Sequence, residues 1–294
     1  MDFLQAALLG LLQGLTEFLP ISSSAHLRIA GDLLGWGDPG ATFTAITQLG
    51  TELAVLIYFR RRIGTIIAKW FRSFGARGGA HSAGIQKGDP DVRMGWLVII
   101  GTIPIVIVGF LAQDYIRTVF RSLWLVAIVL IVFGILLGIA DRLGRRTKEE
   151  ADISYRDGIL IGIAQMLALI PGVSRSGATT SAGLALGYTR TTAAEFSFLL
   201  AVPAVLGSGL YETYTAFTCD PEYDAAGKLI NGCGEGYGLL PTVLATVIAF
   251  GVGLAIIAFL MRYLKRGSFL PFVIYRIALG GLLIALLSTG VLQP

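Results

Sequence analysis

The chain has 294 residues, of which 54% are hydrophobic and only 14% are charged, and its formal net charge is +4. A typical soluble domain carries about 25% charged residues, and one soluble core of this size cannot hide so much apolar surface from water. The composition therefore excludes a disordered chain, a secreted disulfide scaffold, a coiled coil and a nucleic-acid-binding protein. It predicts an all-α integral membrane protein whose apolar surface faces lipid.

The first segment, residues 1–35, is apolar but is interrupted in its middle by Pro20 and three consecutive serines. A secretory signal peptide ending near Ala25 would have similar hydropathy, but such a signal begins with a basic region. Here the only early charge is Asp2, and Glu17 would interrupt the apolar core. We therefore interpret residues 1–35 as part of the membrane protein itself.

Six further segments have the length and hydropathy of membrane-spanning helices, which need roughly 20 residues to cross about 30 Å of hydrocarbon. Three of them contain no charged residue, and the others contain one ionisable residue each, Glu52, Glu195 or Arg276. A second broken segment lies at residues 158–187. The predicted spans cover residues 40–59, 94–112, 122–140, 195–211, 238–261 and 269–288.

The charges of the connecting segments predict the orientation in the membrane. Residues 60–93 hold eight basic and two acidic residues, whereas residues 212–237 hold five acidic residues and one basic residue. Because basic loops stay in the cytoplasm, we predict a cytoplasmic basic loop at 60–93 and an external acidic loop at 212–237, with both termini outside. Apolar residues at helical spacing in the basic loop predict a short helix on the inner membrane surface.

Both cysteines, Cys219 and Cys233, lie in the acidic loop. An external loop lies in an oxidising compartment, so we expect a disulfide between them. Two unpaired thiols are the alternative.

The two broken segments are copies of one another. Residues 10–35 align without gaps on residues 162–187, and nine of the 26 aligned positions are identical, where composition alone would supply about two or three. Because three spans follow each copy, the second copy enters the membrane from the opposite side, which predicts an inverted-topology duplication. We predict a single transmembrane domain, residues 1–294, with repeat one at 1–141 and repeat two at 158–294.

Each copy is expected to enter halfway into the membrane and return. Pro20 in the first copy, and Pro171 with Gly172 in the second, break the helices at matching places, and irregular backbone at membrane depth is tolerated around a cavity. A helix that begins there points unpaired N–H groups at the gap, which suits an anion such as phosphate. The alternative is an ordinary span kinked at proline. The predicted fold is six full spans plus two re-entrant hairpins.

The two copies differ where chemistry is expected. Where the first copy has Glu17, Ser23 and His26, the second has leucine, Arg175 and alanine. Ionisable groups are costly at membrane depth, so a functional site is the default interpretation. The Arg175 guanidinium can hold phosphate oxygens in a bidentate manner, and nearby hydroxyls add neutral donors. The predicted phosphate-binding residues are Gln13, Ser174, Arg175, Ser176 and Thr179.

The predicted catalytic groups are Glu17, Ser23, His26 and Arg175. A carboxylate beside a phosphate would repel it unless a divalent cation lay between them, so we expect Glu17 to bind Mg²⁺ or Ca²⁺. Ser23 and His26 lie three residues apart, which permits His26 to remove the Ser23 proton or to attack phosphorus itself. The alternatives are a structural hydrogen bond at Glu17, a satisfied core histidine at His26, and serines that only cap a helix.

The ionisable residues of the full spans are not expected to be catalytic. Glu52 and Glu195 are interpreted as polar contacts that stabilise their spans, although Glu52 follows Gln48 by four residues and could line the cavity. Arg276 is expected to reach for the cytoplasmic interface.

Two motifs make the sequence similar to a known family. Residues 13–26 contain Gln-x-x-x-Glu followed by Pro-x-Ser-Ser-x-x-His, and residues 171–179 read Pro-Gly-x-Ser-Arg-Ser-Gly-Ala-Thr. Together they resemble the signature motifs of the undecaprenyl-pyrophosphate phosphatase family, bacterial membrane proteins associated with bacitracin resistance. The likeness extends to residues 195–203 and 269–276, and so covers nearly the whole chain.

The resemblance implies an enzyme of the bacterial cytoplasmic (inner) membrane that removes one phosphate from undecaprenyl diphosphate, recycling the lipid carrier for peptidoglycan synthesis. It also implies a divalent-metal site that opens to the outer side. Family members carry Glu or Gln at the first motif position, so the uncharged Gln13 is not expected to be an essential base. The implied roles are metal and diphosphate binding for Glu17, phosphoryl chemistry for Ser23 and His26, and phosphate binding for Ser174, Arg175 and Thr179.

A second function fits the same architecture, namely a polyprenyl-phosphate lipid flippase or transporter, because inverted repeats with broken helices are frequent in transporters. The difference between the copies favours an enzyme, since a transporter needs only binding groups. The expected partners are a polyprenyl diphosphate lipid and the bilayer, without nucleic acid, and the sequence leaves a homodimer open.

Overall fold

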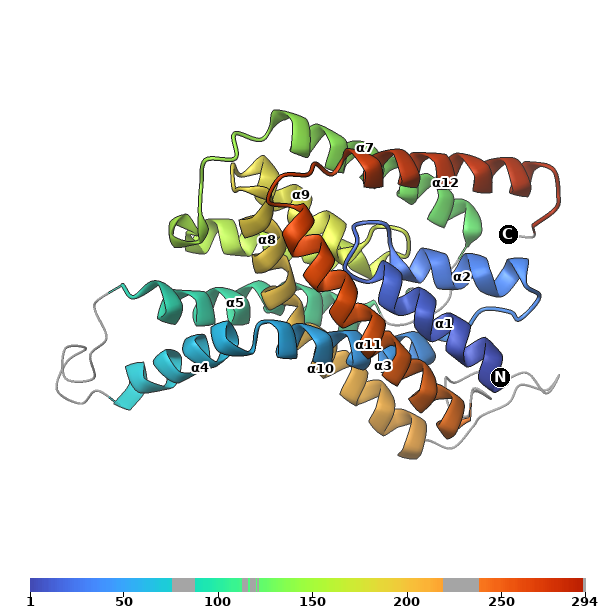
Figure 1. Cartoon of the computed structure of the whole chain (residues 1–294), viewed down its shortest axis with the longest axis horizontal. Coiled ribbons are helices and arrows are strands. Elements are labelled where there is room, and N and C mark those ends of the chain that lie inside the picture. Colours follow the sequence, from blue (N-terminus) through green and yellow to red (C-terminus); the bar gives the residue numbers. More distant parts are fainter. Residues whose placement is uncertain (76–87, 113–115, 117–119, 121, 219–237, 293–294) are drawn as a thin grey trace.

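The computed structural model describes residues 1–75, 88–112, 116, 120, 122–218 and 238–292. The regular secondary structure of these residues is helical, without a strand, and six of their helices are long and apolar enough to cross a membrane (Figure 1). The prediction of an all-α integral membrane protein with six spans is thereby confirmed. Both cysteines, and with them the predicted disulfide, lie outside the described residues.

The six spans expose large apolar side chains on their outer surfaces, as expected of helices whose solvent is lipid. Phe110 is 80% exposed and Val247 is 59% exposed. The span that contains Glu195 begins earlier than predicted, at Arg190, because the hydroxyl of the preceding Thr189 accepts a hydrogen bond from the N–H of Thr192 and caps the helix there. The spans are α3 (Gly40–Tyr58), α5 (Pro90–Leu111), α7 (Leu123–Leu143), α10 (Arg190–Thr218), α11 (Leu239–Tyr263) and α12 (Leu270–Ser288).

Each of the two broken segments folds into a pair of helices that pack against each other around a turn (Figure 1). The first pair is α1 (Phe3–Thr16) and α2 (Ser23–Leu33). The second pair is α8 (Tyr155–Met166) and α9 (Arg175–Ala185), with a single 3₁₀ turn at Leu167–Leu169 after α8. The breaks fall at the proline-containing turns that the sequence indicates.

The N-caps of α2 and α9 share an unusual backbone conformation. Ser22 has φ +73° and Ser174 has φ +68°, in the left-handed region that residues other than glycine rarely adopt. Each serine hydroxyl accepts a hydrogen bond from the N–H three residues ahead, at Ala25 and Gly177. This cap holds the first N–H groups of each helix at the turn where the chain reverses.

The first helix of each pair packs closely on one span through a glycine. At Gly10 of α1 a Cβ atom would lie 2.4 Å from the carbonyl oxygen of Ala245 in α11, and at Gly162 of α8 one would lie 2.4 Å from the carbonyl oxygen of Gly101 in α5. Such backbone-to-backbone approach is typical of helices that associate in membranes through small residues. α11 also packs on α3, α5 packs on α10, and α7 packs on α12.

The helix predicted in the basic loop is present as α4 (Arg60–Gly75), with a strongly amphipathic sequence. Its Arg62 pairs with Asp91 and Glu150, and its Lys69 forms ion pairs of 2.6 Å with Asp91 and 3.0 Å with Asp89. The opposite side exposes Ile67, Phe71 and Phe74. This division of charge and apolar surface is that of a helix lying in a membrane interface, and its cytoplasmic position stays a prediction.

Candidate active site

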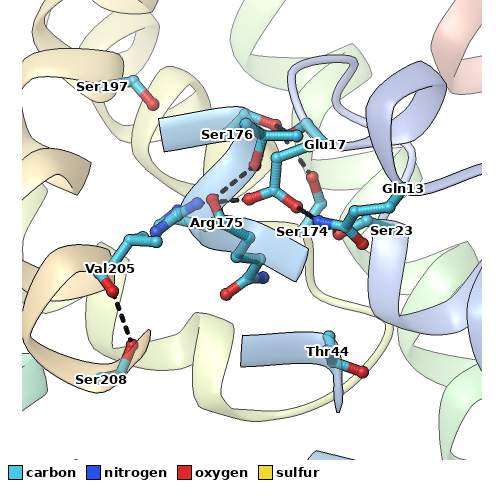
Figure 2. Close-up of polar contacts among 12 residues, drawn as sticks. Gln13, Glu17, Ser23, Thr44, Ser174, Arg175, Ser176, Ser197, Val205 and Ser208 are labelled. Carbon is cyan, nitrogen blue, oxygen red and sulfur yellow. Dashed lines mark hydrogen bonds and ion pairs between the residues drawn. The ribbon is translucent and has the colours of Figure 1, made fainter. Parts of the chain in front are cut away.

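The carboxylate of Glu17 is the centre of a buried polar cluster at the end of α1 (Figure 2). Ser23 Oγ donates to Glu17 Oε2 at 2.6 Å, and Gln13 Nε2 donates to the same oxygen at 2.7 Å. Glu17 Oε1 accepts from Nη2 of Arg175 in an ion pair. Residues from both broken segments are therefore in direct contact, although they are 158 positions apart in the sequence.

The two turns are also joined through Ser176, the second residue of α9. Its hydroxyl lies 3.4 Å from the carbonyl oxygen of Glu17 and 3.3 Å from that of Leu19. Thr179, one turn further along α9, bonds to the carbonyl oxygen of Arg175 and to the Ser197 hydroxyl. Both hydroxyls thus fix the position of α9 against its neighbours.

A cavity of about 530 Å³ adjoins this cluster. Of the residues predicted to bind phosphate, Ser174 and Arg175 line it, whereas Gln13, Ser176 and Thr179 do not. Glu17 and Ser23 line the cavity as well, next to Arg175, to which Glu17 is bonded. A guanidinium, a carboxylate and a hydroxyl therefore face one space large enough for the headgroup of a ligand.

His26 does not lie where the sequence spacing suggests. Its Nδ1 lies 2.7 Å from the carbonyl oxygen of Ser22, and its Nε2 lies 2.7 Å from the Tyr275 hydroxyl, against whose ring it stacks. Because a carbonyl can only accept, we assign the proton to Nδ1, which leaves Nε2 to accept from Tyr275. His26 does not line the cavity, and the Ser23 hydroxyl is bonded to Glu17 instead.

Arg276 occupies a position opposite to the expected one. It is completely buried rather than directed to the cytoplasmic interface. Its guanidinium donates at 3.0 Å to the carbonyl oxygens of Pro20 and Val173, and at 2.7 Å to that of Gly172. Arg276 thus bridges the two turns, and sequence reasoning missed this role although an arginine inside an apolar span was a visible signal.

The other two ionisable residues of the spans lie apart from the cavity. Glu52 is 2% exposed, one of its carboxylate oxygens has no hydrogen-bond partner among the described residues, and its neighbour Gln48 lines the cavity instead. Glu195 is half-buried near Glu150 and Arg62, at the end of α10 that faces the basic loop. Neither position indicates a direct part in chemistry.

The cluster contains oxygen ligands suited to a hard divalent cation. Among the described residues no three His, Cys, Asp or Glu side chains gather into a ready-made metal site. The side-chain amide of Gln13 donates to Glu17 through Nε2, and its oxygen, Oε1, is buried without a hydrogen-bond partner among the described residues. Mg²⁺ is commonly held by one or two carboxylates together with substrate phosphates, so Glu17, which lines the cavity, fits such an ion, whereas Gln13 directs its amide N–H and not Oε1 at Glu17.

The fold and the site together define the class of the protein. It is an integral membrane protein in which two broken helix pairs bring charged residues together at a cavity. The family follows from a comparison with known proteins. The family model of bacitracin resistance protein BacA matches residues 6–282, and the chain belongs to that family.

Curated relatives match over the full length of the chain. A protein of Clavibacter michiganensis is 63% identical over 290 residues, covering 99% of this chain and 98% of the relative. A protein of Micrococcus luteus is 57% identical over all of both chains, and one of Thermobifida fusca is 51% identical over 100% of this chain and 93% of the relative. All three are named undecaprenyl-diphosphatase.

Proposed function

We propose that the chain hydrolyses undecaprenyl diphosphate to undecaprenyl phosphate and inorganic phosphate, and so recycles the lipid carrier for peptidoglycan synthesis and confers bacitracin resistance. The observation that carries the proposal is the 2.6 Å hydrogen bond from Ser23 Oγ to Glu17, with Arg175 beside it at one cavity. A hydroxyl paired with a base is the arrangement of an activated nucleophile. The relatives with this name support the substrate assignment.

In the proposed reaction Arg175 holds oxygens of the terminal phosphoryl group, because a guanidinium has N–H donors beyond the one that pairs with Glu17. Ser23 Oγ attacks the terminal phosphorus while its proton passes to Glu17. The bond from that phosphorus to the bridging oxygen breaks, and the lipid monophosphate leaves as an anion. Water then attacks the phosphorus of the phosphoserine and the bond from phosphorus to Ser23 Oγ breaks. Glu17 returns its proton to Oγ, and both protons of the water leave with the inorganic phosphate.

His26 has a different part in this proposal from the one expected from its spacing. With both ring nitrogens bonded to Ser22 and Tyr275, it holds the start of α2 and with it the position of Ser23. Attack by water activated directly by Glu17 is the alternative to a phosphoserine. Trapping a phosphorylated Ser23 by mass spectrometry distinguishes the two.

We propose Mg²⁺ or Ca²⁺ as cofactor, held by Glu17, which lines the cavity. When bound, the ion would offset the negative charge that gathers where Glu17 and the diphosphate meet. The residues of the chain would orient the headgroup and move the Ser23 proton. Chelation is expected to stop phosphate release.

We propose that the two halves are inverted repeats with re-entrant hairpins. The equal lengths of α2 and α9, the matching φ angles of Ser22 and Ser174, and the matching glycine contacts of α1 and α8 support the duplication. The loop charges support external termini and a cavity open to the outer side of the inner membrane, and Glu212, the first residue of the acidic loop predicted to be external, lines that cavity. The homodimer stays a prediction.

Hydrolysis is tested with purified protein, undecaprenyl diphosphate and Mg²⁺, by measuring inorganic phosphate. Ser23→Ala is expected to lower kcat by at least about 100-fold, since it removes the proposed nucleophile. Ser181→Ala is the matched control, because the Ser181 hydroxyl donates to the carbonyl oxygen of Gly177 in its own helix and Ser181 does not line the cavity. Release of phosphate by Ser23→Ala at the wild-type rate would exclude Ser23 as nucleophile, and no release by the wild type would favour a transporter.

A further inference from the structure

One side of α4 attaches this helix to α5 (Figure 1). Ile66 on this side is buried, and the Trp70 indole lies so close to Gly95 of α5 that a Cβ atom added there would meet it at 2.7 Å. The charged residues of the same side, Arg62 and Lys69, both form ion pairs with acidic residues. The attachment of α4 uses this side, and the opposite side is left exposed.

The exposed side of α4 divides lengthwise into an apolar edge and a basic edge. The apolar edge consists of Ile67, Phe71 and Phe74, which recur at helical spacing. The basic edge, here called the basic stripe, consists of Arg61, Thr65, Ala68 and Arg72, all of which are exposed. The two edges run side by side along the helix, so α4 presents an apolar and a basic surface next to each other.

The two arginines of the basic stripe are not neutralised by acidic side chains. α4 contains no acidic residue, and neither Arg61 nor Arg72 forms an ion pair in the part of the chain that the structure describes. By contrast, the guanidinium of Arg62 on the attached side pairs with two carboxylates. Two exposed guanidiniums attract an anion, and their N–H groups match the oxygens of a phosphate.

We propose that the exposed side of α4 binds anionic phospholipids, with the apolar edge among the acyl chains and with Arg61 and Arg72 at the headgroup phosphates. The position of α4 supports this occupant, because α4 begins at Arg60, directly after the span α3 ends at Tyr58. The helix therefore starts at the boundary of the hydrocarbon, where lipid headgroups lie. An acidic protein segment would complement the basic stripe but would leave the apolar edge uncovered.

The test compares phosphatidylglycerol with phosphatidylcholine, because both carry a phosphate and acyl chains and only the first has a net negative charge. Native mass spectrometry of the full-length protein in neutral detergent gives an apparent Kd for each lipid. The wild type is expected to bind phosphatidylglycerol at least about fivefold more tightly, since one basic residue near an anionic surface contributes roughly that factor. Arg61→Gln combined with Arg72→Gln is expected to raise the Kd of phosphatidylglycerol at least about fivefold and that of phosphatidylcholine less than about twofold.

The matched control is Arg145→Gln combined with Arg146→Gln, which removes the same charge from two exposed arginines in the loop after α7. It is expected to leave both Kd values within about twofold of wild type, and Arg61→Lys with Arg72→Lys, which keeps the charge, is expected to retain the preference. If the double glutamine variant of α4 does not fold, Arg72→Gln alone decides.

Three results would overturn the proposal: a wild type without the preference, an unchanged Kd of phosphatidylglycerol in the glutamine variants of α4, or an equal rise in the Arg145 and Arg146 variant. The first result would leave the basic stripe to an acidic protein segment. The measurement follows lipid binding and not phosphate release, so its outcome is independent of the proposed function.

Discussion

At the scale of single residues, the interactions of Glu17 determine what the site can do. Burying an isolated carboxylate costs several kcal/mol, and here an ion pair with Arg175 and hydrogen bonds from Ser23 and Gln13 offset that cost. The same contacts aim one carboxylate oxygen at the Ser23 hydroxyl. A general base needs this geometry, since proton transfer requires hydrogen-bond distance.

Two buried glutamates, Glu17 at the cavity and Glu52 apart from it, allow a matched comparison. Glu17→Gln keeps the shape of the side chain but removes the proton acceptor, so kcat is expected to fall by about 100-fold or more. Glu52→Gln is expected to change kcat by less than threefold, because Glu52 does not line the cavity. Steady-state phosphate release by both variants checks this. Equal losses in the two variants would mean that the Glu17 carboxylate has no special part.

At the scale of elements, glycines set the distance between the broken helix pairs and the spans. The backbone of α8 approaches α5 so closely at Gly162 that any side chain there would meet the carbonyl group of Gly101. α1 approaches α11 in the same manner at Gly10. These contacts hold α8 against α5 and α1 against α11. They thereby position the two turns at the ends of α8 and α1, and the charged residues in those turns.

The glycine contacts predict stability changes of opposite sign. Gly162→Ala is expected to lower the free energy of unfolding by about 1–3 kcal/mol, because the helices must separate to admit the methyl group. Gly64→Ala in α4 is expected to leave stability unchanged or raise it by up to about 1 kcal/mol, since its Cβ meets no atom within 4 Å and alanine favours helix. Thermal unfolding in detergent measures both changes. An unchanged midpoint for Gly162→Ala would contradict the close packing.

At the scale of the whole molecule, Arg276 connects the two halves. From a span near the end of the chain it donates to carbonyl groups in both turns, which are 103 and 256 positions away along the sequence. Those carbonyl groups lie in breaks between helices, where no helical N–H can reach them. Arg276 therefore satisfies the buried backbone of the turns and holds them together under the site.

Arg276→Met is expected to lower the free energy of unfolding by about 3 kcal/mol or more, because several buried carbonyl groups lose a charged donor at once. Activity should fall as well, since the turns that carry Ser23 and Arg175 lose their common anchor. Arg266→Met is the control, because Arg266 is exposed in the turn after α11. Unfolding midpoints and phosphate release for both variants measure this. A stable and active Arg276→Met protein would show that the turns hold without the bridge.

The sequence by itself determined the elements, because hydropathy, proline and glycine act locally. The six spans, the breaks at Pro20 and Pro171, and the helix at the start of the basic loop could all be predicted before the structure. Glu17, Ser23 and Arg175 could be singled out in the same way, because polar groups inside apolar segments are costly and stand out.

Only the tertiary structure decided which side chains meet. The spacing suggested that Ser23 and His26 are paired. In the structure the turn between α1 and α2 brings the Ser23 hydroxyl to Glu17, and His26 is hydrogen-bonded to Tyr275 of α12. The burial of Arg276 between the turns has the same origin. The partner of a side chain depends on how helices distant in sequence are rotated and packed against one another, and a local pattern of residues does not contain that information.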